Sequence, residues 1–208
     1  MKRTLGILVS GRGSNLRSIL NSVKKRYIKD ANVGVVVSNR DGVPALSIAD
    51  EFKVKRVVIP SSGFAGDRWA YDRLLIDSLE RNGVTRVGGL VILAGFDRIL
   101  SEEFVMHYAN SLINIHPSLL PSFPGLHAQR QALEHGVKLS GCTVHFVVPE
   151  VDAGPIILQK AVEVKDGDTE ESLSDRILKE EHKLYSKAIK LIVEGKVSIS
   201  GRRVVVPR

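Results

Sequence analysis

The segment Leu5-Gly6-Ile7-Leu8-Val9-Ser10-Gly11-Arg12-Gly13-Ser14-Asn15-Leu16 joins an apolar run to a glycine-rich turn. Residues 5–9 are typical of a buried strand, and residues 15–25 predict a helix. Glycines in such a turn let the backbone approach an anion closely, and the helix start offers unpaired N–H groups. The segment therefore predicts the first strand and helix of an α/β sheet, joined either by a phosphate-binding loop or by a plain capped turn in which Ser14 merely starts the helix.

Strands and helices continue to alternate through the first half of the chain. This alternation predicts a parallel sheet with right-handed crossovers. The helix expected at residues 67–81 places Tyr71, Leu74, Leu75 and Leu79 on one face. The other elements expected here are strands at residues 33–37, 56–59 and 90–93 and a helix at residues 43–52.

The second half of the chain predicts antiparallel pairing. Residues 142–148 and 156–164 have the pattern of strands, and the tight connection between them indicates an antiparallel pair. The fold class is therefore α/β, with a mostly parallel, doubly wound, Rossmann-like sheet and an antiparallel C-terminal part. No linker-like composition divides the 208 residues, so a single domain, 1–208, is expected. The remaining expected elements are helices at residues 129–135 and 169–194 and a hairpin at residues 196–206.

Composition narrows the classes of function. The formal charge is +7, but the basic residues are scattered and aromatic residues make up 5%, which argues against a nucleic-acid partner and suits small polyanionic substrates. The single Cys142 excludes a disulfide framework within the chain, and the six histidines show no metal-binding spacing, so no metal is expected. No apolar run approaches the roughly 20 residues of a membrane span. We therefore expect no membrane association and a cytoplasmic location.

A second polar segment follows a later apolar run. Leu112-Ile113 leads as a strand into Asn114-Ile115-His116-Pro117, and alternate strand side chains share a face, so Asn114 and His116 form a pair. An amide beside an imidazole at the carboxyl end of a strand suits catalysis, although a histidine there also has a structural interpretation. The loop after this pair is expected to be rigid because it contains Pro117, Pro121 and Pro124.

Four motifs together resemble the folate-dependent formyltransferases of purine synthesis. In chain order they are Ser10-Gly11-Arg12-Gly13-Ser14-Asn15-Leu16, Leu93-Ala94-Gly95-Phe96-Asp97-Arg98-Ile99-Leu100, Asn114-x-His116-Pro117-Ser118-Leu119-Leu120-Pro121 and His145-Phe146-Val147-Val148-Pro149-Glu150-Val151-Asp152-x-Gly154-Pro155-Ile156. Each motif alone is weak, but four in the family's order cover nearly the whole chain. The resemblance implies a nucleotide- and phosphate-binding half, 1–100, and a catalytic and folate-binding half, 101–208.

The resemblance implies transfer of the formyl group of the cosubstrate 10-formyltetrahydrofolate to the amine of glycinamide ribonucleotide. Asn114, His116 and Asp152 match the family's catalytic trio. In that trio His116 would be the general acid, Asn114 would bond the oxyanion, and Asp152 would raise the pKa of His116. Taken alone, Asp152 would be a turn former. His145 is expected either to support the acid or to be a packed strand histidine.

The resemblance also implies binding roles. The substrate phosphate would be held by Gly13, Ser14 and Asn15, and its ribose hydroxyls by Glu181. The folate would contact Arg68, Arg98, Ile99, Leu100 and Asn114. Without the resemblance, Arg68 is an ordinary solvated charge and Glu181 has a surface-facing alternative. The family usually has methionine at the position of Asp97, a departure that affects packing there.

Two other functions remain open on the sequence. One is hydrolysis of formyltetrahydrofolate, which related deformylases perform with a similar core. The other is a non-catalytic module that binds nucleotides or RNA. The glycine loop favours formyl transfer over both. A homodimer is implied by the resemblance alone.

Overall fold

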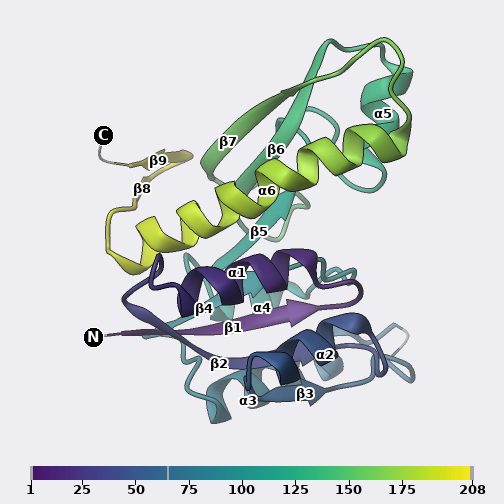
Figure 1. Cartoon of the computed structure of the whole chain (residues 1–208). Coiled ribbons are helices and arrows are strands. Elements are labelled where there is room, and N and C mark those ends of the chain that lie inside the picture. Colours follow the sequence, from purple (N-terminus) through teal and green to yellow (C-terminus); the bar gives the residue numbers. More distant parts are fainter. Residues whose placement is uncertain (1, 65, 207–208) are drawn as a thin grey trace. The chain divides into compact units, whose positions relative to one another are not determined.

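The computed structural model describes residues 2–64 and 66–206. The chain forms two compact units, Met1–Ile113 and Asn114–Arg208. Helices alternate with parallel strands in the first unit, and the second unit contains an antiparallel strand pair covered by a long helix (Figure 1). The predicted α/β fold class, mostly parallel with an antiparallel C-terminal part, is confirmed.

The first unit is built on four parallel strands in the order β3-β2-β1-β4. The central strand β1 (Arg3–Val9) pairs with both β2 and β4, and Leu5, Ile7 and Leu8 on it are fully buried. Strands β2 and β3 lie on one side of β1, and β4 lies on its other side. The carboxyl ends of β1 and β4 therefore flank a topological switch point. The other strands are β2 (Ala31–Ser38), β3 (Arg56–Val58) and β4 (Gly89–Leu93).

Each of these strands is followed by a helix, and two of the four helices differ from the sequence prediction. In α3, Tyr71, Leu75 and Leu79 are fully buried as expected, but Leu74 is 42% exposed, so its assignment to the buried face was wrong. The short helix α4 was not predicted. Its N-cap Ser101 accepts a hydrogen bond from Phe104 N–H and is followed by two glutamates, a start signal that the sequence contained. The helices are α1 (Ser14–Lys24), α2 (Pro44–Glu51), α3 (Arg68–Arg81) and α4 (Glu102–His107).

The second unit continues from β5 (Leu112–His116), whose last three residues belong to it. Strands β6 and β7 pair antiparallel, as predicted, with a register shift between Val144 and His145. The helix α6 packs on both strands, and its N-cap Thr169 forms a capping box with Ser172. The remaining elements are α5 (Ala128–Glu134), β6 (Leu139–Phe146), β7 (Ile156–Glu163), α6 (Glu170–Val193), β8 (Ser198–Ser200) and β9 (Arg203–Val205).

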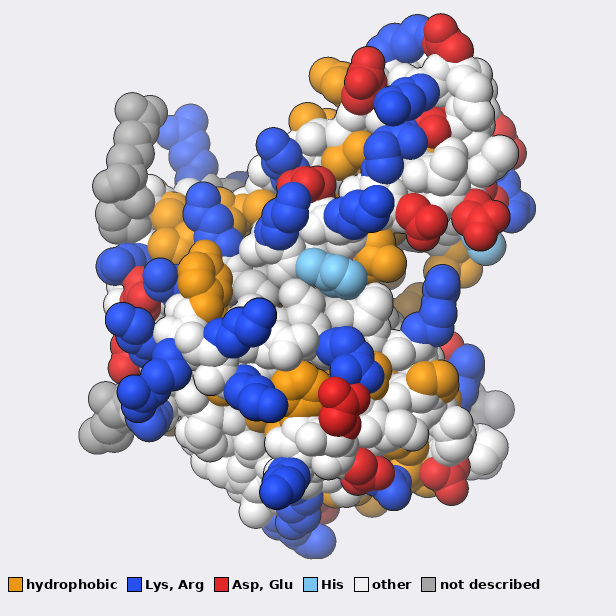
Figure 2. Space-filling model, viewed as in Figure 1, with side chains coloured by type: hydrophobic (Ala, Val, Ile, Leu, Met, Phe, Trp, Pro, Cys, Tyr) orange, Lys and Arg blue, Asp and Glu red, His pale blue; other side chains and the backbone are white. Residues whose placement is uncertain are grey.

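The terminal hairpin and the surface agree with the sequence prediction. Strands β8 and β9 pair antiparallel through a turn that contains Gly201. On the face seen in Figure 2, Lys and Arg side chains are dispersed and Asp and Glu lie among them. Within residues 2–64 and 66–206, none of the helices has the length and apolar composition that a membrane crossing needs.

Candidate active site

The second unit brings Asn114, His116, His145 and Asp152 together. Asn114 and His116 lie on β5 with one residue between them, so their side chains project to the same side, as predicted. His116 Nδ1 lies 3.2 Å from Asp152 Oδ2, and His145 Nε2 lies 3.6 Å from Asp152 Oδ1. The side chains of the two histidines and the aspartate are at most 10% exposed. The result is a largely buried polar cluster at the carboxyl end of β5, in which Asn114 is half-buried.

Asp152 is fixed by the tight connection between β6 and β7. Its φ of 52° lies in the left-handed region, which aspartate tolerates better than most residues. Two residues later, a Cβ on Gly154 would lie 1.7 Å from the carbonyl oxygen of Phe146, so only glycine fits there. Asp152 Oδ2 also accepts a hydrogen bond from Gly125 N–H at 2.8 Å. Asp152 therefore shapes the loops as the turn interpretation expects, and it also contacts both histidines.

His116 is surrounded by hydrogen-bond acceptors. Its Nε2 lies 2.8 Å from the carbonyl oxygen of Phe123, and its Nδ1 faces Asp152. Burial lowers the pKa of His116, whereas the Phe123 carbonyl and the Asp152 carboxylate raise it, and burial dominates. The contribution of the Asp152 carboxylate has the predicted direction, and burial outweighs it in the sum. The sequence does not show how deeply His116 is buried, and burial decides the net direction of its pKa shift.

His145 fixes the amide of Asn114. His145 Nδ1 lies 2.9 Å from the carbonyl oxygen of Phe146, so in the neutral ring this nitrogen carries the proton. His145 Nε2 is then an acceptor, and it lies 3.4 Å from Asn114 Nδ2. One N–H of the Asn114 amide therefore points to His145, and the second N–H is left for another acceptor.

Asp152 is suited to stay ionised inside this cluster. Burial raises the pKa of its carboxyl, but hydrogen bonding at the carboxylate and the two neighbouring histidines outweigh burial and hold that pKa below its ordinary value. A negative charge is therefore present beside both imidazoles near neutral pH.

The glycine loop of the first unit has a left-handed residue at the start of α1. Gly13 is the N-cap with φ 76°, no side chain caps the helix, and Ser14 is the first residue of α1. A Cβ on Gly13 would lie 2.8 Å from Ala45 Cα in α2, which shows that this glycine also allows two helices to approach. Asn15 is buried, and Ser14 is half-buried.

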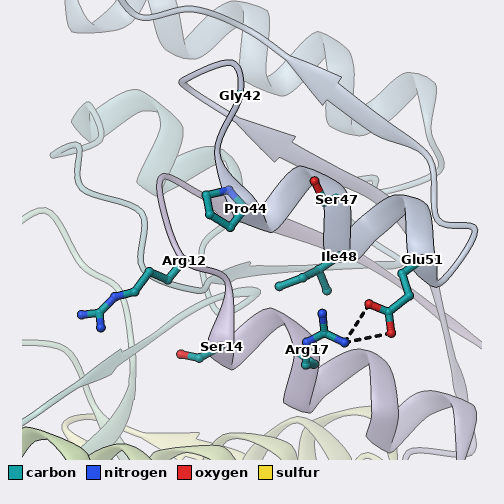
Figure 3. A pocket seen from close by; sticks show the side chains of 8 residues that line it. All are labelled: Arg12, Ser14, Arg17, Gly42, Pro44, Ser47, Ile48 and Glu51. Carbon is teal, nitrogen blue, oxygen red and sulfur yellow. Dashed lines mark hydrogen bonds and ion pairs between the residues drawn. The ribbon is translucent and has the colours of Figure 1, made fainter.

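A cavity of about 630 Å³ opens beside this loop. In Figure 3, Arg17 points to Glu51, with which it forms an ion pair at 2.8 Å, whereas Arg12 and Ser14 extend to the other side. None of the hydrogen bonds or ion pairs among the described residues involves Arg12. Arg12 therefore contributes the uncompensated positive charge of the cavity. The lining residues are Arg12, Ser14, Arg17, Gly42, Pro44, Ser47, Ile48 and Glu51.

The residues expected to contact folate in the first unit have mixed environments. The guanidinium of Arg98 lies 4.5 Å from the centre of the Tyr71 ring, and its Nε is buried without a hydrogen-bond partner among the described residues. Ile99 is 55% exposed, Leu100 is buried, and Arg68 is exposed at the start of α3. These positions all lie in the unit Met1–Ile113.

Asp97 makes contacts that a methionine could not make. Its Oδ1 accepts a hydrogen bond from Asn39 Nδ2 at 3.0 Å, and its Oδ2 pairs with Arg40 Nη2. Its backbone N–H donates to Ser10 Oγ at 3.0 Å. Sequence reasoning missed Asn39 and Arg40, which are more than 50 residues away along the chain and carry no motif.

Glu181 is the remaining predicted binding residue. It lies on α6 in the second unit and is 7% exposed, so the surface-facing alternative was wrong. Among the described residues, no group of three or more His, Cys, Asp or Glu side chains is arranged to hold a metal ion.

Comparison with known proteins identifies the family. The family model described as formyl transferase matches residues 3–189. The chain belongs to the formyl transferase family. This formyl transferase is 42% identical over 193 residues to phosphoribosylglycinamide formyltransferase of Escherichia coli, with 93% of this chain and 88% of that protein covered. A crystal structure of glycinamide ribonucleotide transformylase 1 from Symbiobacterium toebii has 46% identity and a TM-score of 0.94, with 100% of this chain and 95% of that chain covered.

Some relatives of this formyl transferase are much longer. The trifunctional purine biosynthetic protein adenosine-3 of Gallus gallus is 44% identical over 198 residues, which cover 95% of this chain. The chain spans 19% of the length of that relative.

Proposed function

We propose that this formyl transferase moves the formyl group of 10-formyltetrahydrofolate to the amine of glycinamide ribonucleotide in purine biosynthesis. The observation that carries the proposal is the cluster in which His145 links Asn114 to Asp152 and His116, in a chain of this family. The similarity to phosphoribosylglycinamide formyltransferase of Escherichia coli over 88% of that protein supports the same substrates.

In the proposed reaction, the substrate amine attacks the formyl carbon of the folate. A C–N bond forms, the carbonyl oxygen gains negative charge, and the bond from carbon to the folate nitrogen then breaks. The second N–H of Asn114, which His145 leaves free, bonds the developing oxyanion without a change of charge. His145 is therefore a positioning residue for the amide.

His116 is the general acid in this proposal. Both of its ring nitrogens face oxygen acceptors, so the imidazolium is hydrogen-bonded at both ends once it forms. Burial opposes that charge in the free protein, and negative charge developing on the formyl oxygen favours it. His116 thus holds its proton while the tetrahedral species forms and gives it to the folate nitrogen as that nitrogen leaves. The attacking amine releases one proton, which reaches His116 through water held at Asp152 and replaces the proton that His116 gave up.

The binding roles follow the chemistry of the residues. We assign the substrate phosphate to Gly13, Ser14 and Asn15, where the helix start supplies N–H donors, and the ribose hydroxyls to the buried carboxylate of Glu181. We assign the folate to Arg68, Arg98, Ile99, Leu100 and Asn114, and the unpartnered Nε of Arg98 offers a donor. The folate is a cosubstrate, and the proposed chemistry uses no metal.

The proposal is tested by measuring formyl transfer and folate hydrolysis together. The protein is incubated with 10-formyltetrahydrofolate with and without glycinamide ribonucleotide, and the formylated product and tetrahydrofolate are quantified. We expect folate turnover to require the amine, and we expect His116→Ala to abolish it while the control His107→Gln, on α4, retains it. Dominant hydrolysis without the amine would instead indicate a deformylase. RNA binding without turnover would indicate a binding module.

A cytoplasmic location and a homodimer complete the proposal. Both come from the resemblance to enzymes of purine synthesis. Light scattering over a range of protein concentrations tests the dimer, because a monomer at all concentrations would contradict it.

A further inference from the structure

Three loops of the first unit meet at the carboxyl ends of its strands. The glycine loop (residues 10–15) follows β1, the β2–α2 loop (residues 39–43) follows β2, and the folate segment (residues 95–100) follows β4. In a parallel sheet this edge is where ligands bind, and the switch point lies between β1 and β4. The relative positions of these loops therefore decide how substrates are held in this unit.

Two hydrogen bonds join the glycine loop to the folate segment through Ser10. Ser10 N–H donates to the carbonyl oxygen of Gly95 at 3.1 Å, and Ser10 Oγ accepts from Asp97 N–H at 3.0 Å. Ser10 is 4% exposed, so water competes little for these bonds. The residue that begins the glycine loop is thus fixed by the folate segment.

The side chain of Asp97 extends this connection to the β2–α2 loop. Its carboxylate accepts a hydrogen bond from Asn39, which is 3% exposed, and pairs with Arg40. The same loop leads into α2, where Ala45 N–H donates to the carbonyl oxygen of Gly11 at 3.1 Å. Polar contacts therefore join the three loops in a closed ring. Ser10 contacts the folate segment, Asp97 of that segment contacts Asn39 and Arg40, and Ala45 N–H returns to Gly11 of the glycine loop.

We propose that Asp97 is a positioning residue that couples the glycine loop to the folate segment. Through Arg40 and Asn39, the carboxylate holds the two loops in one arrangement, so that a ligand that orders one loop also favours the bound form of the other. The inference rests on the proposed function for the identity of the two ligands. An apolar side chain at this position would offer no acceptor, so the side-chain part of the ring depends on the Asp97 carboxylate.

The ion pair itself adds little stability. The side chains of Arg40 and Asp97 are 59% and 41% exposed, and exposed pairs of this kind have small effects on folding. Replacement of Asp97 should therefore leave the unit folded while it frees the buried amide of Asn39 from its partner. Loss of that partner should lower the melting temperature slightly, and the effect that tests the proposal is in loop order and ligand coupling.

Hydrogen exchange tests loop order without any ligand. We expect Asp97→Met to speed amide exchange in residues 10–15 about fivefold, because local opening governs exchange there. The matched control is Asp50→Asn, which breaks the ion pair of Asp50 with Arg56, also in the first unit and similarly exposed. The control should leave exchange in residues 10–15 unchanged. Equal exchange in the two variants would overturn the proposal.

Ligand titrations test the coupling itself. We expect the parent protein to bind glycinamide ribonucleotide about fivefold more tightly when tetrahydrofolate is saturating, a typical size for coupling between sites. In Asp97→Met that ratio should fall to about one, and Asp50→Asn should keep the ratio of the parent. An unchanged ratio in Asp97→Met overturns the coupling. A parent protein that binds neither ligand instead contradicts the proposed function, and the exchange experiment then still decides the role of Asp97.

Discussion

Replacement of Asp152 by Asn removes one charge from the centre of the catalytic cluster and keeps the shape of the side chain. The amide oxygen can still accept the hydrogen bond from Gly125, and asparagine also tolerates the left-handed backbone conformation at this position. The fold should therefore survive. At the observed 3.2 Å from His116 Nδ1, an effective dielectric constant of about 20 gives roughly 5 kcal/mol of attraction between the carboxylate and an imidazolium.

This attraction is large enough to account for a general acid–base contribution. Loss of such a contribution slows turnover roughly 10²–10⁴-fold, which corresponds to about 3–5 kcal/mol in the barrier. Because the carboxylate is one of the groups that raise the pKa of His116, that pKa falls further in the variant. Activity that depends on the imidazolium should then decline at a lower pH than in the parent.

The assay is steady-state formyl transfer to glycinamide ribonucleotide from pH 5 to 9, together with thermal melting. Asp166→Asn is the matched control, since Asp166 is an exposed aspartate paired with Lys138 and should not affect turnover. An Asp152→Asn variant that melts like the parent and turns over within a few-fold of it at every pH would refute the role of Asp152. A lower melting temperature with normal turnover would show that Asp152 only stabilises the turn.

Three further substitutions test other parts of the proposal. Arg12→Ala should raise the KM for glycinamide ribonucleotide about tenfold and leave the KM for folate unchanged, because a charged hydrogen bond contributes about 1.5–3 kcal/mol. The control is Arg17→Ala, which removes an arginine already paired with Glu51. Equal effects of the two substitutions would exclude a special role of Arg12. Gly13→Val should lower stability by about 1–3 kcal/mol, since its Cβ meets the backbone of α2, and an unchanged melting temperature would contradict the packing described here. His145→Leu should lower kcat about tenfold with little change in KM, because Asn114 loses the acceptor that orients its amide. A normal kcat would show that His145 has no role in the mechanism.

The strands and helices were largely predictable because their apolar periodicity is local. Strand β1 is a continuous apolar run, and the faces of α3 and α6 repeat at helical spacing. Leu74 was misplaced because the stripe of Tyr71, Leu75 and Leu79 follows i, i+4 spacing, and a residue at i+3 can lie at its solvent-exposed margin.

The site was predictable in its residue types and less so in its energetics. The motifs named Asn114, His116 and Asp152, but they contain no information about desolvation, which sets the net direction of the pKa shift of His116. The main-chain partners, the carbonyl of Phe123 and the N–H of Gly125, carry no side-chain signal at all. Contacts between distant segments, such as Asp97 with Arg40, are likewise invisible to local patterns.

The cluster on β5 depends on contacts between segments that are far apart in the sequence. Asn114 and His145 are separated by 31 residues, and Gly125 and Asp152 by 27. Such contacts form only after the intervening chain has closed its loops, which makes them late events in folding. The β6–β7 connection, held tight by Gly154, supplies Asp152 to the cluster. During refolding, recovery of catalytic activity should therefore lag behind recovery of helical signal and should report when the last strands of the second unit have docked.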